Sequence, residues 1–308
     1  MATQKGKNVS VCAVRGNFDD AQTGVKALFA GAETAKKLKD AGYRLSSANS
    51  INWGRLVPQI AYYFWAYSAL ADKGAIRPGE NIDFVVPTGN FGDILAGYYA
   101  KRMGLPVRKL VCASNANRVL TDFFETGIYD KNRAFKKTSS PSMDILISSN
   151  LERLLFEASG RDAAAVARFM EGLKNEGRYD VGEETKRVIA KDFSAGCAGE
   201  EEAFGALLGV FKRTGELIDT HTAVAQAVYD KTKDETAAVV LSTASPYKFP
   251  QDVLSAIEPD KNPPKDGFEA AAALSDRTKT EVPGQILALR KAPVRFTGSC
   301  DKDEMEKA

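Results

Sequence analysis

Histidine is almost absent from this sequence, since His221 is the only one among 308 residues. The four cysteines, Cys12, Cys112, Cys197 and Cys300, lie far apart, and none belongs to a C-x-x-C pair. Zinc sites are built from closely spaced cysteine and histidine ligands, so the sequence predicts no metal site. Widely spaced cysteines are also typical of a reducing compartment, where disulfides are rare.

An excess of charge of one sign and a long apolar run are also missing. The 42 Lys and Arg residues nearly balance the 40 Asp and Glu residues, which leaves a net charge of +2. That balance gives no general attraction to nucleic acid or to an acidic membrane surface. No apolar stretch approaches the roughly 20 residues of a transmembrane helix, and the start, MATQKGKNVSVCAV, has no signal-peptide core. We therefore expect a cytoplasmic protein whose partners include neither nucleic acid nor membrane.

What the sequence has instead is an alternation of strand and helix patterns. The predicted strands are NVSVCAV (8–14), NIDFVVP (81–87), VRKLVCASN (107–115) and the start of AAVVLSTASPYKFP (237–250), with APVRFTGSC (292–300) as an edge strand. The predicted helices are 17–42, capped by Asn17 or Asp19 and ended by Gly42, then 53–74 with Pro58 near its start, and 92–104. Such alternation predicts a doubly wound, mainly parallel α/β sheet. Residues 115–235 are expected to form a helical elaboration on it.

A glycine-containing turn lies between the second strand and the helix that follows it. It reads Thr88-Gly89-Asn90-Phe91-Gly92-Asp93. Glycines allow the backbone to approach a ligand closely, and successive N–H groups at a helix start form an anion site. A tight strand-to-helix turn with Asp93 as the helix cap is the alternative interpretation.

A second group of polar residues precedes the helix at 53–74. NSINWGR places Asn49, Ser50, Asn52 and Arg55 close together, and Arg with Ser suits a phosphate or a carboxylate. The alternative is that Asn52 caps the helix and Arg55 is solvated.

A third group follows the strand at 237–241. Ser242, Thr243 and Ser245 lie where a buried strand ends, and ligands of doubly wound sheets bind at that edge. A hydroxyl there could meet a ring nitrogen, whereas the alternative is a Ser/Thr turn leading into Pro246. His221, near a helix start, has no paired nucleophile, so the sequence does not support a catalytic triad.

Together and in this order, these segments resemble the threonine synthase family, in its long bacterial and fungal form. The segments that carry the resemblance are GNFDDAQ (16–22), NSINWGRLVPQIAYY (49–63), VVPTGNFGDILAGYYAKRMGLP (85–106), TSSPSMDILISSNLERLLFE (138–157), HTAVA (221–225) and LSTASPYKFP (241–250). The resemblance implies a fold type II enzyme of the kind seen in the tryptophan synthase β chain, dependent on pyridoxal 5'-phosphate (PLP). It also implies conversion of O-phospho-L-homoserine and water into L-threonine and phosphate.

The resemblance assigns roles by motif. Thr88, Gly89, Asn90, Phe91 and Gly92, with Asp93 beside them, match the loop that holds the PLP phosphate. Thr243 matches the residue whose hydroxyl meets the pyridine nitrogen. Asn49, Ser50, Asn52 and Arg55 match the group that binds the substrate's phosphate. Ser245 departs from the family members that read TAHP at this point, which removes a histidine from that position.

One family element has no counterpart here, namely the segment resembling AFKD whose lysine forms the Schiff base with PLP. AFKK at 134–137 has only a superficial similarity and lies after the phosphate loop. The chain is therefore expected to be the C-terminal remainder of the fold, with no catalytic residue of its own. Residues 1–75 would be the rest of the small domain and a linking helix, and residues 76–308 the large PLP-binding domain.

Two other functions remain open on the sequence. One is a non-catalytic binder of phosphate or PLP. The other is a different fold type II lyase, such as a serine or threonine dehydratase, which shares the glycine loop but does not explain NSINWGR as well. Loss of part of a sheet would expose apolar surface, so we also expect poor solubility or marginal stability.

Overall fold

The computed structural model describes residues 1–16, 18–47 and 51–307. Asn17, one of the two predicted helix caps, and residues 48–50 lie outside this description. The chain forms two compact units, which are described separately: residues 48–281, and residues 1–47 together with 282–308. Among the described residues, no helix has both the length and the apolar character that crossing a membrane requires.

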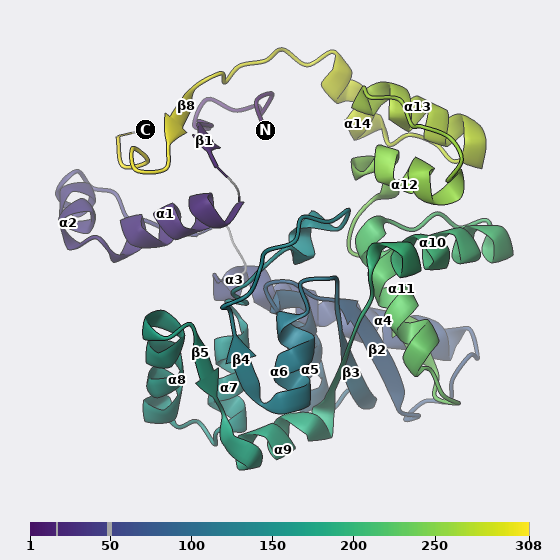
Figure 1. Cartoon of the computed structure of the whole chain (residues 1–308), viewed down its shortest axis with the longest axis horizontal. Coiled ribbons are helices and arrows are strands. Elements are labelled where there is room, and N and C mark those ends of the chain that lie inside the picture. The colour runs from purple at the N-terminus through teal and green to yellow at the C-terminus, as the bar shows by residue number, and fades with distance from the viewer. Residues whose placement is uncertain (17, 48–50, 308) are drawn as a thin grey trace. The chain divides into compact units, whose positions relative to one another are not determined.

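A four-stranded parallel sheet is the centre of the larger unit. Its strands are β2 (Ile82–Pro87), β3 (Val107–Ser114), β6 (Phe193–Cys197) and β7 (Ala238–Val240), in the spatial order β6-β3-β2-β7. All six residues of β2 are buried, as expected for a strand covered on both faces. The predicted parallel α/β architecture is confirmed (Figure 1).

Helices α3 (Trp53–Leu56) and α4 (Ile60–Asp72) replace the single helix predicted at 53–74. A 3-10 turn, η1 (Val57–Gln59), separates them, because Pro58 lacks the N–H that a continuous helix needs. Helix α5 (Gly92–Arg102) then packs against β2 and β3. Its Gly97 has no room for a side chain, since a Cβ there would lie 2.5 Å from the ring of Tyr63.

The segment expected to be a helical elaboration is only partly helical. It contains α6 (Val119–Thr126), β4 (Ile128–Asp130), η2 (Pro141–Met143), α7 (Leu151–Ala158), α8 (Ala163–Asn175), β5 (Arg178–Asp180), α9 (Gly182–Asp192), β6, α10 (Glu200–Thr214) and α11 (Thr220–Thr232). The correction concerns β6, which joins the edge of the main sheet with Leu110 opposite Phe193. Its sequence, FSAGC, is short and rich in small residues, so it carries little strand signal.

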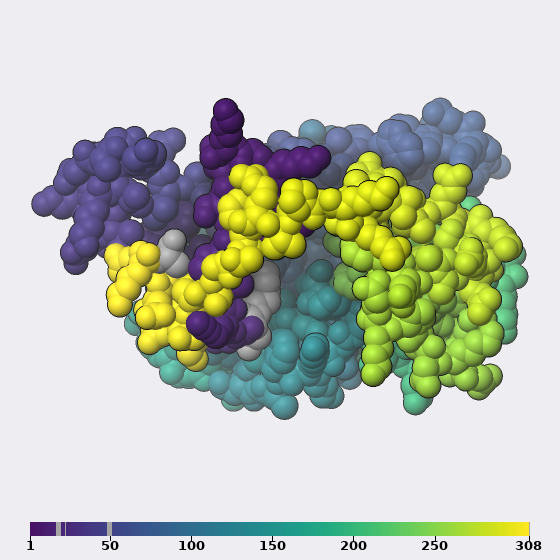
Figure 2. All heavy atoms as spheres, turned by 90° about the horizontal axis from the view of Figure 1, so that it is seen from above, coloured from purple at the N-terminus to yellow at the C-terminus, as the bar shows by residue number. Residues whose placement is uncertain are grey.

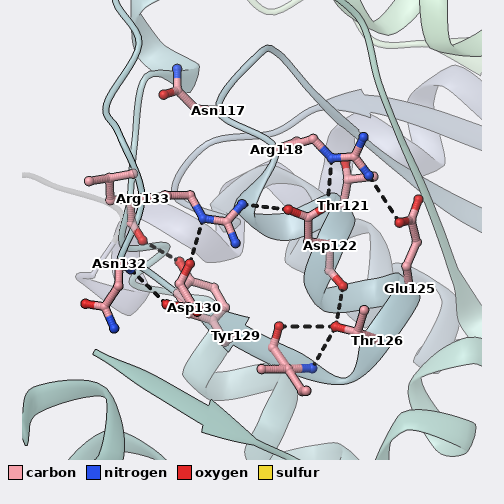
Figure 3. Close-up of polar contacts among 12 residues, drawn as sticks. Asn117, Arg118, Thr121, Asp122, Glu125, Thr126, Tyr129, Asp130, Asn132 and Arg133 are labelled. Carbon is pink, nitrogen blue, oxygen red and sulfur yellow. Dashed lines mark hydrogen bonds and ion pairs between the residues drawn. The ribbon is translucent and has the colours of Figure 1, made fainter. Parts of the chain in front are cut away.

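Ion pairs fix α6 to the loop after β4. Figure 3 shows the guanidinium groups of Arg118 and Arg133 directed at the carboxylate of Asp122, each 2.6 Å from one of its oxygens. Burial by itself favours the neutral acid, but the hydrogen bonds from Arg133 and Arg118 hold the pKa of Asp122 below its ordinary value. In the same helix, the hydroxyl of Thr121 donates a hydrogen bond to the carbonyl of Gly196 in β6.

The larger unit ends with η3 (Pro246–Lys248), α12 (Pro250–Ile257) and α13 (Gly267–Thr278). The smaller unit contains β1 (Ala13–Arg15), α1 (Phe18–Ala30), α2 (Ala32–Asp40), α14 (Gly284–Arg290) and β8 (Ser299–Asp301). The single helix predicted at 17–42 is therefore two helices. Strands β1 and β8 pair with each other in parallel, although they come from opposite ends of the chain.

Little of the smaller unit is buried. Between α14 and β8 the chain runs as an extended segment, visible in yellow in Figures 1 and 2. Of its described hydrophobic residues, Cys300 alone is buried. The main core lies in the larger unit, around Phe84, Ile94 and Leu110, all of which are completely buried.

Candidate functional site

A cavity of about 950 Å³ in the larger unit collects most of the side chains identified above. Residues 87–94, which follow β2, line it together with residues 239–244 at the end of β7. These two strands are parallel, so their carboxyl ends open at one edge of the sheet, where doubly wound proteins bind ligands. Helices α3 and α4 and the turn between them contribute Arg55, Gln59 and Trp65.

The glycine turn provides the cavity with backbone donors that have no acceptor. Within the described part of the chain, the N–H groups of Gly89 to Asp93 donate no hydrogen bond. Their carbonyls are engaged on another side: that of Gly89 accepts from the Ser148 hydroxyl at 2.8 Å, and that of Asn90 accepts from the Asn150 amide at 2.9 Å. Successive free N–H groups at a helix start are suited to bind an anion.

Two backbone features give the turn its shape. Phe91 has a φ of +62°, in the left-handed region, and α5 begins at the next residue. Its ring is buried against Phe124 and Phe193, which stabilises this uncommon conformation. A Cβ on Gly89 would lie 2.3 Å from the carbonyl oxygen of Ser142, so only glycine fits there without a shift of the backbone.

Asp93, in the first turn of α5, places a carboxylate at the cavity beside the glycine turn. Burial raises its pKa to about 6, against the opposing effect of a hydrogen bond from Tyr63. The Tyr63 hydroxyl lies 3.1 Å from a carboxylate oxygen of Asp93 and 2.9 Å from its backbone carbonyl. Near neutral pH this group therefore changes charge more readily than an ordinary aspartate does.

The two threonines predicted for the site differ in their exposure to solvent. Thr88 is buried, and its hydroxyl donates to the carbonyl of Val86 at 2.7 Å. Thr243 is exposed and lines the cavity. Ser245 has a different place, since its side chain caps η3 by accepting from the backbone of Tyr247 at 3.3 Å.

Not all of the described residues predicted to bind a substrate phosphate line the cavity. Arg55 lines it, whereas Asn52 does not and instead caps α3 by accepting from the Gly54 amide at 2.9 Å. Asn49 and Ser50 lie outside the described residues. The structure therefore agrees with the helix-cap interpretation for Asn52, and it places Arg55 at the cavity.

Sequence reasoning assigned no role in the site to His221, Ser142 and Lys248, which also line the cavity. Ser142 comes from η2, His221 from the start of α11, and Lys248 from η3. Their distance along the chain hides this arrangement, and the only signal was the presence of all three segments among those that carry the family resemblance. Tyr62 and Trp65 of α4 complete the lining with exposed aromatic rings.

The described residues contain no cluster of three or more His, Cys, Asp or Glu side chains that could hold a metal ion. The arrangement instead places successive backbone N–H groups without acceptors beside an aromatic-lined cavity, with one arginine and several hydroxyls among the described lining residues. Such a site suits a phosphorylated small molecule with a flat ring.

Comparison with known proteins gives consistent matches. The family model "Threonine synthase, C-terminal" matches residues 222–304. A threonine synthase from Pseudomonas aeruginosa is 42% identical over 258 residues, which is 83% of this chain and 53% of the relative. A protein called threonine synthase-like 1, from Macaca fascicularis, is 42% identical over 248 residues, covering 80% of this chain and 33% of the relative.

A solved structure gives the same result for the fold. The PLP-bound threonine synthase from Brucella melitensis matches with a TM-score of 0.80 and 39% identity, over 99% of this chain and 60% of that one. The fold type II architecture expected from the sequence is thus confirmed. The chain spans between a third and about half of these two curated relatives.

Proposed function

We propose that this chain, which carries the threonine synthase C-terminal domain and resembles the later part of threonine synthases, is the cofactor-binding part of an enzyme of that type. The cofactor is PLP. The reaction is the conversion of O-phospho-L-homoserine and water into L-threonine and phosphate, which makes the whole enzyme a carbon-oxygen lyase acting on phosphates.

The free N–H groups of Gly89 to Asp93 carry this proposal. They are donors without acceptors among the described residues, at a helix start, on a cavity large enough for a phosphorylated ring. Phe91 and Gly92 are buried, and buried donors are normally satisfied, so this run of donors without acceptors points to an anionic ligand. The residues present therefore fit a PLP phosphate.

The remaining cavity residues take roles that match their positions. Thr243 offers a hydroxyl to the pyridine nitrogen, and Tyr62 and Trp65 offer aromatic rings that a flat cofactor ring can contact. Arg55 supplies the positive charge for the substrate's phosphate. The resemblance alone assigns Asn49, Ser50 and Asn52 to the same phosphate, since the first two lie outside the described residues and Asn52 caps α3. When bound, PLP serves as the electron sink that stabilises negative charge on substrate carbons.

The family's lysine that binds PLP covalently has no matching segment in these residues. Lys248 is the lysine that lines the cavity in the described part of the chain, and it follows the glycine turn by more than 150 residues of sequence. We propose that Lys248 does not take that role and that these 308 residues bind PLP without turning over substrate. The division into residues 1–75 and 76–308 is part of the same proposal.

A titration of the 308-residue chain with PLP tests the proposal. Trp65 lines the cavity, so we expect PLP to quench its fluorescence, whereas in a Trp65→Phe variant the remaining Trp53, which does not line it, should respond less. Saturable quenching that inorganic phosphate competes away would support binding at the glycine turn. Absence of saturable quenching would contradict the proposed cofactor.

Borohydride reduction of the same mixture, with assays of turnover, tests whether these 308 residues catalyse by themselves and whether the dehydratase alternative holds. We expect no single lysine to be labelled stoichiometrically and no phosphate release from O-phospho-L-homoserine. Stoichiometric labelling of Lys248 with turnover would show that the chain is complete as a catalyst. Release of ammonia from serine or threonine would favour a dehydratase instead.

A further inference from the structure

His221 is buried, yet it reaches the cavity through an ordered set of hydrogen bonds. It lies in the first turn of α11, whose N-terminal cap is Asp219. The Asp219 carboxylate is completely buried and accepts from the backbone N–H of His221 at 2.9 Å. The same oxygen lies 2.8 Å from Nδ1 of the imidazole, and the other oxygen accepts from the hydroxyl of Thr222.

These contacts determine the protonation of both groups. Burial by itself favours the neutral acid, but the hydrogen bonds from His221 and Thr222 hold the pKa of Asp219 below its ordinary value, so the carboxylate is ionised. On the other side of the ring, Nε2 lies 3.1 Å from the backbone N of Ser142. A backbone N–H only donates, so Nε2 carries no proton and Nδ1 carries the proton that faces Asp219.

Ser142 connects the imidazole to the anion site. Its N–H donates to Nε2, and its carbonyl oxygen is the atom that a Cβ on Gly89 would approach to 2.3 Å. The start of α11 makes a second hydrogen bond to the same segment, in which the Thr220 hydroxyl donates to the carbonyl of Ser139 at 2.7 Å. The first turn of α11 therefore holds the backbone around Ser142 in place, and that backbone contacts one face of the glycine turn.

From this geometry we infer that His221, in its neutral Nδ1–H tautomer, is a positioning residue that holds Ser142 against Gly89 and so sets the anion-binding N–H groups of the turn. The inference deepens the proposed function and rests on its anion site. A proton on Nε2 would face the Ser142 N–H with a second donor, and the link would be lost.

Two substitutions at His221 distinguish the effect of losing the hydrogen-bond acceptor from the effect of changing the packing. His221→Gln places an amide oxygen near the position of Nε2 and does not titrate, whereas His221→Leu fills similar space without an acceptor. Val224→Ala is the matched control, because it truncates a buried side chain of the same helix that has no polar contact. The probe is sulfate, whose charge stays constant between about pH 5 and pH 8, as that of phosphate does not.

The experiment measures sulfate affinity of the 308-residue chain from the amide shifts of Gly89 and Gly92, with thermal unfolding as a check on folding. At about pH 7.5 we expect His221→Leu to bind roughly tenfold more weakly, with His221→Gln and Val224→Ala close to the unmodified chain. If His221→Leu does not fold, His221→Phe, which also lacks an acceptor, takes its place in the comparison with His221→Gln.

The outcomes distinguish the inference from the proposed function. Equal affinity of His221→Gln and the variant without an acceptor would overturn the positioning role and leave the anion site intact. Shifts of neither glycine amide in the unmodified chain would overturn the anion site, and the inference with it.

Discussion

Asp93 shows how burial alters one side chain at the cavity. Its raised pKa of about 6 means that the folded chain binds a proton more tightly than the unfolded chain, where an aspartate titrates near 3.8. Stability is therefore highest while the group is protonated in both states. It falls as the pH rises from about 4 to about 6, because the folded chain must then bury a charge.

We predict that Asp93→Asn removes this fall. The amide keeps an oxygen to accept from Tyr63, so the variant should be more stable than the unmodified chain at pH 7, by an amount on the order of 2 kcal/mol, and equal to it below about pH 4. Chemical denaturation at a series of pH values measures both. Equal stabilities of the two proteins at pH 7 would show that the carboxylate is better solvated than its position implies.

Gly89 is the residue at which the backbone leaves least room. Gly89→Ala should cost roughly 1–3 kcal/mol, because the new methyl group meets the carbonyl oxygen of Ser142, and it should also weaken PLP binding. Gly205→Ala is the matched control, since it lies in α10 with no atom near the added methyl, and it should stabilise the chain by about 0.5–1 kcal/mol. A harmless Gly89→Ala would mean that the turn is not held against Ser142.

At the scale of elements, α6 shows how a helix is fixed by charge as well as by packing. Its apolar side packs through Phe123 against Tyr129 and Tyr179, the aromatic residues of β4 and β5. Its polar side has Asp122 between two guanidinium groups (Figure 3). Because the pKa of Asp122 is lowered, it contributes stability at neutral pH that is lost as the pH falls through its folded value.

We predict that Asp122→Asn destabilises the chain at pH 7 by roughly 1–2 kcal/mol, as two arginines lose one shared carboxylate. The difference should shrink at low pH, opposite in sign to the effect at Asp93. Glu125→Gln is the control, because this exposed carboxylate lies 3.2 Å from Arg118 and should change stability by less than about 0.5 kcal/mol. A larger loss in Glu125→Gln than in Asp122→Asn would reverse this assignment.

At the scale of the whole molecule, the two compact units differ in how much core they have. Residues 48–281 contain almost all of the buried apolar side chains, while Cys300 is the buried hydrophobic residue described in residues 1–47 and 282–308. A unit with so little core opens locally at low cost. Exposed aromatic residues such as Trp65 add to the apolar surface, and poor solubility stays a prediction.

Limited proteolysis should follow this division. We expect early cleavage near residues 47 and 282, followed by a resistant fragment of about residues 48–281, because protease needs locally opened chain. Mass spectrometry of the fragments over time identifies the order. First cleavage within β2 or α11 would show that the larger unit is the less stable one.

The sequence by itself determined the local structure around the site. NIDFVVP predicts a buried strand because it is nearly continuously apolar, and the glycines of TGNFGD predict the turn between that strand and α5, for which anion binding stays a proposal. Pro58 marks the interruption between α3 and α4 because it lacks an N–H. These features depend on neighbouring residues, and the family resemblance adds the identity of the ligand.

Tertiary structure alone decided which distant segments meet. FSAGC becomes β6 because β3 offers an open edge, and β1 pairs with β8 although nearly the whole chain separates them. His221, Ser142 and Gly89 form one connected set through a hydrogen bond and a backbone contact that no spacing in the sequence predicts. The physical reason is that periodicity and turn chemistry act over a few residues, whereas strand pairing and packing join residues regardless of their separation.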